Sequence, residues 1–167
     1  WWSGGGTGVL AASREYQLEG ILAKKLDSTY RPGQRSPLWR KVKNIRAQSA
    51  VIGGWLPGAG RRAGGIGSIL LGLPEADGLR FIGSVGTGLT DQMLDDLGRE
   101  LRRHSRRTSP FNDKVPPTAG KKPHWIEPVL VAEVSYAEWG SAGRLRHPVW
   151  RGLRDDLNPE DVMDESE

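Results

Sequence analysis

One carboxylate and two lysines stand in a pattern that could bind a phosphate ester. Glu19 opens the apolar run Glu19-Gly-Ile-Leu-Ala-Lys24, and Lys41 and Lys43 occupy alternate positions in Trp39-Arg-Lys-Val-Lys43. Because alternate side chains of a strand share a face, both ammonium groups would point into one space, with Glu19 supplied from a neighbouring strand. Two cations and one acid suit a phosphate ester with a divalent metal. The alternative interpretation is a pair of edge strands whose charges are simply solvated.

The elements that would position these residues are a helix and two short strands. Residues 9–17 are rich in the helix-forming residues Ala, Leu, Arg and Glu, whereas 18–24 and 39–43 are typical of strands. Pro-Gly and Ser-Pro pairs between residues 27 and 37 predict a connecting loop.

The chain beyond these strands is predicted to be rich in β-structure. Strands are expected at 49–56, 68–73 and 79–85, and a long strand region at 125–139, followed by a basic segment at 144–154. A helix is expected after the third strand, with Thr90 as its N-cap and its end at about Arg107. Its aspartates come early and its arginines late, which suits the helix macrodipole. Apolar residues recur along this helix with helical spacing and are expected in the core: Met93, Leu94, Leu97 and Leu101.

Three strands, one helix and then further strands is the order of the oligonucleotide/oligosaccharide-binding (OB) fold. We therefore expect a mainly β protein of the α+β class. Its parts would be a short first domain over 1–46, a five-stranded Greek-key barrel with one helix over 47–157, and an acidic tail over 158–167.

Composition limits the classes of function. The 167 residues allow one domain or one domain plus part of another, and the absence of cysteine excludes disulfides and thiolate zinc sites. Neither a membrane-spanning run nor a signal peptide is evident, and the first residue, Trp1, suggests a fragment or a processed chain. The net charge of +4 leaves two interpretations open, namely attraction of polyanions and ordinary solubilising charge.

Other catalytic chemistry finds little support in the sequence. His104, His124 and His147 are isolated and lack the spacing of metal ligands. The glycines of 58–67 are not followed by Gly-Lys-Ser/Thr, so they do not form a phosphate-binding loop. No serine occupies a Gly-x-Ser-x-Gly elbow.

The chain resembles the ATP-dependent DNA ligases, and most of all the bacterial ligases of end-joining repair. The resemblance starts near Val9 and covers almost all of the following sequence. The segments that carry it are Glu19-Gly-Ile-Leu-Ala-Lys24, Trp39-Arg-Lys-Val-Lys43, Val51-Ile-Gly-Gly-Trp55, Phe81-Ile-Gly-Ser-Val-Gly-Thr-Gly88, Trp125-Ile-Glu-Pro-Val-Leu-Val-Ala-Glu-Val134 and Arg146-His-Pro-Val-Trp-Arg-Gly-Leu-Arg154-Asp-Asp156. Each segment alone is a weak signal, whereas their order and spacing together are specific.

This resemblance implies a nucleotidyltransferase domain followed by an OB barrel, and it implies roles for individual residues. Glu19 matches the acid that helps to hold the divalent metal, Mg²⁺ or Mn²⁺. Lys41 and Lys43 match the pair that contacts the α-phosphate of ATP, and Lys24 matches the basic end of the Glu19 motif. Three arginines match the C-terminal motif that orients the leaving pyrophosphate, namely Arg146, Arg151 and Arg154.

The sequence departs from the family pattern in two places. The nucleophilic lysine of the family lies in a Lys-x-Asp-Gly motif, which this sequence lacks; Lys25-Leu-Asp-Ser28 is a partial match in the wrong place. The C-terminal motif usually ends in Asp-Lys, but here Leu157 follows Asp156. Residues 1–46 are therefore expected to be the end of a nucleotidyltransferase domain.

The resemblance implies part of a ligase that seals nicks through lysyl-AMP and DNA-adenylate, in DNA repair, recombination and replication. Alone, the chain is expected to bind DNA but not to adenylate itself. The expected partners are nicked duplex DNA and other end-joining proteins. The protein is expected to be a monomer in the bacterial cytoplasm, at the nucleoid and not at a membrane. Two alternatives remain open: a non-catalytic OB module that binds nucleic acid, and a relative of capping enzymes or RNA ligases.

Overall fold

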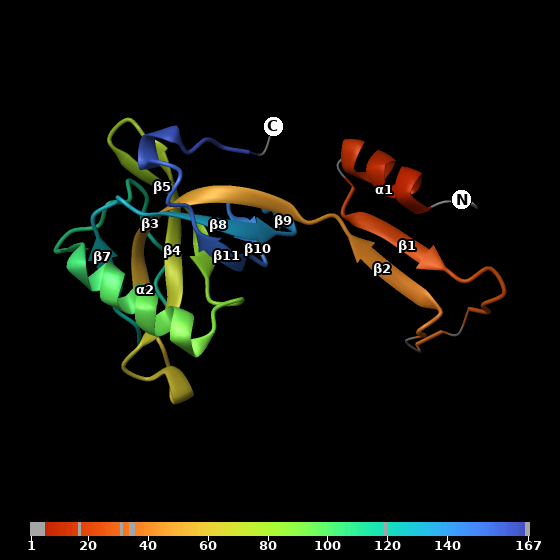
Figure 1. Ribbon diagram of the computed structural model, residues 1–167, viewed down its shortest axis with the longest axis horizontal. Helices are drawn as coiled ribbons and strands as arrows, with labels where there is room; N and C mark the ends of the chain where they lie inside the picture. The colour runs from red at the N-terminus through yellow and green to blue at the C-terminus, as the bar shows by residue number, and fades with distance from the viewer. Residues whose placement is uncertain (1–5, 17, 31, 34–35, 119, 166–167) are drawn as a thin grey trace. The chain divides into compact units, whose positions relative to one another are not determined.

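The computed structural model describes residues 6–16, 18–30, 32–33, 36–118 and 120–165. The chain divides into two compact units, 1–45 and 46–167, and each is described by itself. Figure 1 shows a small unit of one helix and two strands, and a larger unit built mainly of strands.

The first unit contains the helix α1 (Gly6–Glu15) and the strands β1 (Gly20–Lys24) and β2 (Trp39–Lys43). The strands are antiparallel, with Gly20 opposite Lys43 and Leu22 opposite Lys41. Residues directly opposite one another lie on the same face of a strand pair, so β1 and β2 present one face that contains both lysines.

Asn44 connects the helix, the segment after it and the end of β2. Its side-chain amide donates to Ser13 Oγ at 3.0 Å and to the Leu18 carbonyl at 2.8 Å, while its backbone N–H donates to the Glu19 carbonyl at 2.9 Å. Ser13 and Asn44 are both buried. A buried amide is stable when its donors are satisfied in this way, so Asn44 holds Glu19 close to the end of β2.

The second unit is built around five strands. These are β3 (Arg46–Pro57), β4 (Ile66–Glu75), β5 (Gly78–Val85), β8 (Val131–Tyr136) and β11 (Val149–Leu153). Their antiparallel order is β11-β8-β3-β4-β5. A parallel bridge between Thr87, just after β5, and Val149 in β11 joins the two ends of this order, and the Trp150 N–H donates to the Thr87 carbonyl at 2.9 Å.

This arrangement is the OB fold that the sequence predicts. The helix α2 (Asp91–Arg103) comes between the third and fourth strands of the five, as expected. Short elements complete the unit: β6 (Ser105–Arg106), β7 (His124–Ile126), β9 (Glu138–Trp139), β10 (Leu145–Arg146), and the 3₁₀ turns η1 (Gly60–Arg62) and η2 (Pro159–Asp161).

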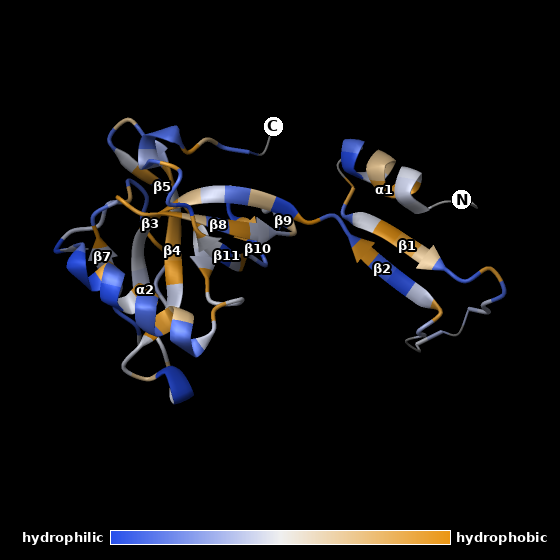
Figure 2. Cartoon of the chain, viewed as in Figure 1, coloured by the Kyte–Doolittle hydropathy of each residue, from blue (hydrophilic) through white to orange (hydrophobic). Residues whose placement is uncertain are grey.

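The core lies between the strands and α2. Thr90 caps the helix by accepting a hydrogen bond from the Met93 N–H at 3.2 Å, as predicted. Leu94, Leu97 and Leu101 are buried, but Met93 is 45% exposed, so the apolar stripe is narrower than its spacing suggested. Figure 2 shows the contrast between apolar strands such as β4 and the hydrophilic outer side of α2.

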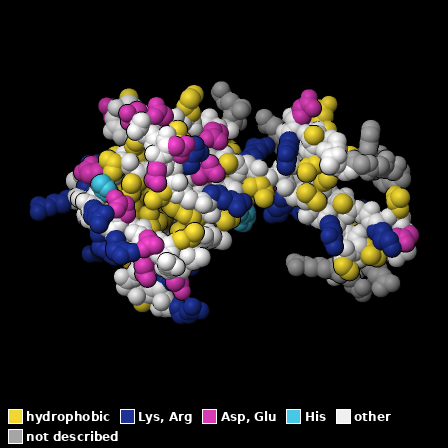
Figure 3. Space-filling view, viewed as in Figure 1, with side chains coloured by type: hydrophobic (Ala, Val, Ile, Leu, Met, Phe, Trp, Pro, Cys, Tyr) yellow, Lys and Arg dark blue, Asp and Glu magenta, His cyan; other side chains and the backbone are white. Residues whose placement is uncertain are grey.

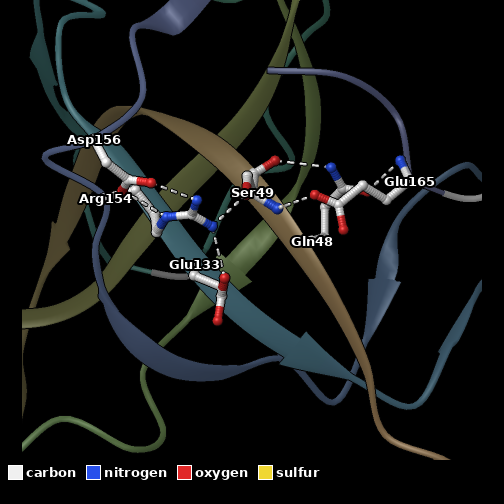
Figure 4. Close-up of polar contacts among 6 residues, drawn as sticks. All are labelled: Gln48, Ser49, Glu133, Arg154, Asp156 and Glu165. Carbon is white, nitrogen blue, oxygen red and sulfur yellow. Dashed lines mark hydrogen bonds and ion pairs between the residues drawn. The ribbon is translucent and has the colours of Figure 1, made fainter. Parts of the chain in front are cut away.

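The described part of the acidic segment, residues 158–165, packs onto the second unit. Val162 is buried in the core at 5% exposure, and Gln48, which is fully buried, donates to the Met163 carbonyl at 2.7 Å and accepts from the Glu165 N–H at 3.0 Å. Figure 4 shows Glu165 beside Gln48 and Ser49. Burial of Val162 anchors the segment, although the acidic residues around it in the sequence do not indicate a buried position.

Among the described residues, no helix has the length and apolar character needed to span a bilayer.

Removing residues 158–167 should destabilise the second unit. Loss of Val162 burial costs about 1.5–3 kcal/mol, which corresponds to a fall of roughly 5–10 °C in the thermal midpoint for a domain of this size. Circular dichroism melting of the shortened chain measures this. Glu160→Gln, at an exposed position of the same segment, is the control and should leave the midpoint unchanged. An unchanged midpoint in the shortened chain would mean that the segment does not contribute to folding.

Candidate functional site

Glu19 and Lys41 form the central contact of the first unit. The Lys41 Nζ donates to Glu19 Oε1 at 2.6 Å, and both side chains are about half exposed. The hydrogen bond and the charge of Lys41 lower the pKa of Glu19, and the charge of Lys43 lowers it further. The predicted carboxylate and the predicted lysine pair therefore share one space, with Glu19 ionised.

Gly20 makes this contact possible. Lys41 and Lys43 lie opposite Leu22 and Gly20, and regular alternation along β1 would turn Glu19 toward the other face. Gly20 has a φ of 151°, a conformation that side-chain-bearing residues rarely adopt, and a Cβ at this position would collide with the Val42 carbonyl oxygen. The glycine thus interrupts the strand directly after Glu19 and lets its carboxylate meet Lys41.

Lys24 occupies the other end of the same strand pair. Its Nζ lies 4.0 Å from the centre of the Trp39 ring, which it faces across the pair. Tyr30 stacks on Trp39 at 5.4 Å, and the indole N–H donates to Ser28 Oγ at 2.8 Å. Cation–π attraction and the hydrogen bond fix Trp39, and Trp39 in turn fixes the position of Lys24.

The same residues line an open cleft of about 700 Å³, which belongs entirely to the first unit. Its lining residues are Val9, Leu22, Lys24, Lys25, Leu26, Ser28, Tyr30 and Trp39. Apolar side chains, one aromatic pair and two lysines are suited to an organic anion, although Lys25 already lies 3.1 Å from Asp27.

The three predicted arginines all lie in the second unit and have different surroundings. Arg146, in β10, is exposed and lies 3.3 Å from Glu138. Arg151, in β11, donates from Nε to Ser135 Oγ at 3.0 Å. Arg146 is thus more available to a ligand than Arg154, which follows β11 and has two carboxylate neighbours.

Arg154 is held by several acceptors at once. Its guanidinium donates to both Asp156 carboxylate oxygens at 2.8 Å, to Glu133 at 2.8 Å and to Ser49 Oγ at 3.4 Å, as Figure 4 shows. Arg154 lowers the pKa of Asp156 to about 2, and the carboxylates raise the pKa of Arg154 further above its ordinary value. Leu157, where the family usually has lysine, packs against the core.

The structure thus groups the predicted residues in two sets. Glu19, Lys24, Lys41 and Lys43 belong to one strand pair of the first unit, and the arginines belong to β10, β11 and the segment after it. Several supporting residues were not predicted: Gly20, Ser28, Tyr30, Asn44, Glu133 and Asp156. The Gly20 position carried a signal, because glycine adopts the positive φ that interrupts the strand here. Asp156 lies only two residues from Arg154, whereas the remaining residues depend on contacts more distant in sequence.

The site around Lys41 and Lys43 offers a divalent cation one protein carboxylate, that of Glu19. Among the described residues, no group of three or more His, Cys, Asp or Glu side chains is close enough to hold a metal ion. Ionised Glu19 can supply a single oxygen ligand, which fits Mg²⁺ or Mn²⁺ bound mainly through substrate phosphates and water. It does not fit a metal held by protein ligands alone.

Lys41→Met should raise the pKa of Glu19 toward its ordinary value, because it removes the hydrogen bond and the larger charge effect. In the unchanged chain, the ion pair should persist below the ordinary pKa of glutamate and be lost as the pH falls through the lowered value. Carbon-13 NMR of the Glu19 carboxyl group measures both. Lys43→Met should have a smaller effect, and Lys122→Met, in the other unit, none. A Glu19 pKa that Lys41→Met leaves unchanged would contradict the described contact.

Comparison with known proteins identifies the family to which the chain belongs. Residues 62–157 match the family described as "ATP dependent DNA ligase C terminal region". The chain is 44% identical over 162 residues to the multifunctional non-homologous end joining DNA repair protein LigD of Mycobacterium tuberculosis, covering 97% of this chain and 21% of that protein. It is 36% identical over 151 residues to a DNA ligase of Natronomonas pharaonis, covering 86% of this chain and 26% of that protein. The chain thus spans about a fifth to a quarter of these relatives.

Solved structures give the same result. The crystal structure of the ligase domain of M. tuberculosis LigD matches with a TM-score of 0.70 at 44% identity, over 98% of this chain and 53% of that one. A mycobacterial DNA ligase D complexed with ATP and MES matches with a TM-score of 0.66, over 98% of this chain and 52% of that one. The predictions of fold and family are confirmed: the chain belongs to the family of ATP-dependent DNA ligase C-terminal regions.

Proposed function

We propose that this chain works as the C-terminal part of an ATP-dependent DNA ligase, which seals nicks through lysyl-AMP and DNA-adenylate. The observation that carries the proposal is the grouping of Glu19, Lys41 and Lys43 on one strand pair, in a chain of this family. Phosphoryl and nucleotidyl transfer depend on positioning and on neutralising charge, and these side chains supply both.

Lys41 and Lys43 would contact the α-phosphate of ATP, and Glu19 would hold the divalent cation. In the described structure, Glu19 and Lys41 neutralise each other at 2.6 Å. Binding of the nucleotide and the cation would break this ion pair, so that Lys41 would bind a phosphate oxygen and Glu19 would bind the cation. The cation supplies charge neutralisation on the phosphate oxygens. Lys24, which lies over Trp39 and lines the neighbouring cleft, would contact the nucleotide there.

Arg146, Arg151 and Arg154 belong to the segment that would meet the leaving pyrophosphate, but their surroundings suit them to unequal roles. Arg146 has a single carboxylate neighbour and is free to turn to a phosphate. Arg154 is already satisfied by Asp156 and Glu133, so its part is to hold the end of β11 in place. Leu157 adds apolar packing where the family has a cation. Arg146 is thus the arginine most suited to direct contact.

The whole reaction needs a nucleophile that this sequence does not contain. The 167 residues include no Lys-x-Asp-Gly motif. Incubating the chain with radiolabelled ATP and Mg²⁺ should therefore give no adenylated band. Appearance of a stable adenylated band would contradict the assignment of the missing nucleophile to another segment.

A chimera in which this chain replaces the matching part of the M. tuberculosis LigD ligase domain should adenylate itself and seal nicked duplex DNA. Lys41→Met in the chimera should lower the adenylation rate by roughly 10²–10³-fold, the usual effect of losing one group that stabilises transition-state charge. Arg40→Gln is the matched control: Arg40 is the neighbouring exposed cation, on the opposite face of β2, and its loss should change the rate little. Equal losses in the two variants would contradict the proposed role of Lys41.

The substrate would be nicked duplex DNA, and other end-joining proteins would be further partners. The protein would act as a monomer in the cytoplasm, at the nucleoid. A relative that acts on RNA is the alternative, and the chimera tests it, because faster sealing of nicked RNA than of nicked DNA would favour that alternative.

A further inference from the structure

Three lysines of the second unit differ from most of its arginines. Arg62, Arg80 and Arg106 are each bound to carbonyl or carboxylate oxygens, and most other arginines of this unit also have acceptors or aromatic neighbours. By contrast, within residues 46–118 and 120–165 the structure gives no hydrogen bond or ion pair to the side-chain amines of Lys114, Lys121 and Lys122. These three lysines line one cleft of about 490 Å³ between β7 and the described residues of 109–118 and 121–123.

The floor of this cleft is fixed by the core. Phe111 is buried and meets the Phe81 ring edge-on at 5.4 Å and the Trp125 ring at 6.0 Å. The backbone is bound to β5 on both sides of Phe111, since Leu79 donates to the Pro110 carbonyl and accepts from the Asn112 N–H, both at 2.9 Å. The side of the cleft at Phe111 is therefore anchored to β5.

The backbone that carries the lysines is also constrained. A turn closes with a 3.0 Å hydrogen bond from the Lys121 N–H to the Thr118 carbonyl. Pro116, Pro117 and Pro123 fix the φ angles around it. Restricted φ angles near the lysines reduce the conformational entropy that is lost when a ligand binds, which favours binding.

The residues that line the cleft carry more positive than negative charge. Asp113 is the one acidic residue among its lining residues, against three lysines. A second cation-rich cleft, lined by Arg61, Arg62 and Arg102, differs in this respect, because Arg61 and Arg62 already lie 3.7 and 3.9 Å from Asp91. Figure 3 shows Lys and Arg side chains at the edge of the larger unit where α2 ends.

We propose that the cleft beside β7 that Lys114, Lys121 and Lys122 line binds the phosphate backbone of duplex DNA. The inference rests on the proposed function, which makes DNA the substrate. Lysine is a mobile point charge that contacts phosphates without reading bases, so the surface would position the duplex whatever its sequence. The cleft thus supplies affinity and register, while the first unit supplies the groups for nucleotide chemistry.

The test compares two variants of the whole chain that lose the same charge. One replaces Lys114, Lys121 and Lys122 by glutamine. The other replaces Arg61, Arg99 and Arg103, which are exposed and paired with carboxylates, by glutamine. Binding to a nicked duplex is measured by fluorescence anisotropy across a salt series, with circular dichroism to verify folding.

The lysine variant should bind at least about tenfold more weakly at 0.1 M salt, and its plot of log affinity against log salt should be less steep by about 2.7, the value for three phosphate contacts. The arginine variant should keep most of the affinity and slope. Equal losses in the two variants would overturn the inference, because net charge alone would then explain binding. If the unchanged chain showed no salt-dependent binding to DNA, the proposed function would fail as well.

Discussion

The candidate site depends on one contact, the ion pair between Glu19 and Lys41, and this contact depends on the backbone of Gly20. A strand sends successive side chains to opposite faces, so an acid before β1 would ordinarily point away from the lysines of β2. The positive φ of Gly20 and its close approach to Val42 turn the chain at the required place. Asn44 then secures the Glu19 backbone from the end of β2. Gly20 and Asn44 thus both hold the backbone of Glu19 beside the end of β2.

The two units use their charges differently. The first carries an acid and several lysines with partly exposed side chains, which the proposed function assigns to a nucleotide and a cation. The second uses many of its charges internally: Arg154 is bound by Asp156 and Glu133, and Arg80 by Glu75 and Asp164. Such pairing stabilises a barrel but removes those cations from substrate binding. The lysines that remain unpaired there are thus the better candidates for contact with DNA.

The sequence predicted most of the fold because local signals agreed with tertiary structure. Thr90 caps α2, and the strand order with one helix after the third strand identified the OB fold. The prediction was poorer where distant contacts decide. The helix ends at Arg103 because Ser105 and Arg106 pair with β7, and the acidic segment folds onto the barrel because Val162 and Gln48 bind it. The pairing of Arg154 with Glu133 joins residues far apart in sequence, and charge patterns could not predict it.

A double-mutant cycle on Glu19 and Lys41 tests the central claim most directly. Self-adenylation rates are measured in the chimera for Glu19→Gln, Lys41→Met and the double variant. If both residues act on one bound nucleotide and its cation, the double variant should lose little more activity than the more damaged single variant, because each change disables the same assembly. Losses that simply multiply would show that the two residues act independently, and would contradict a shared site.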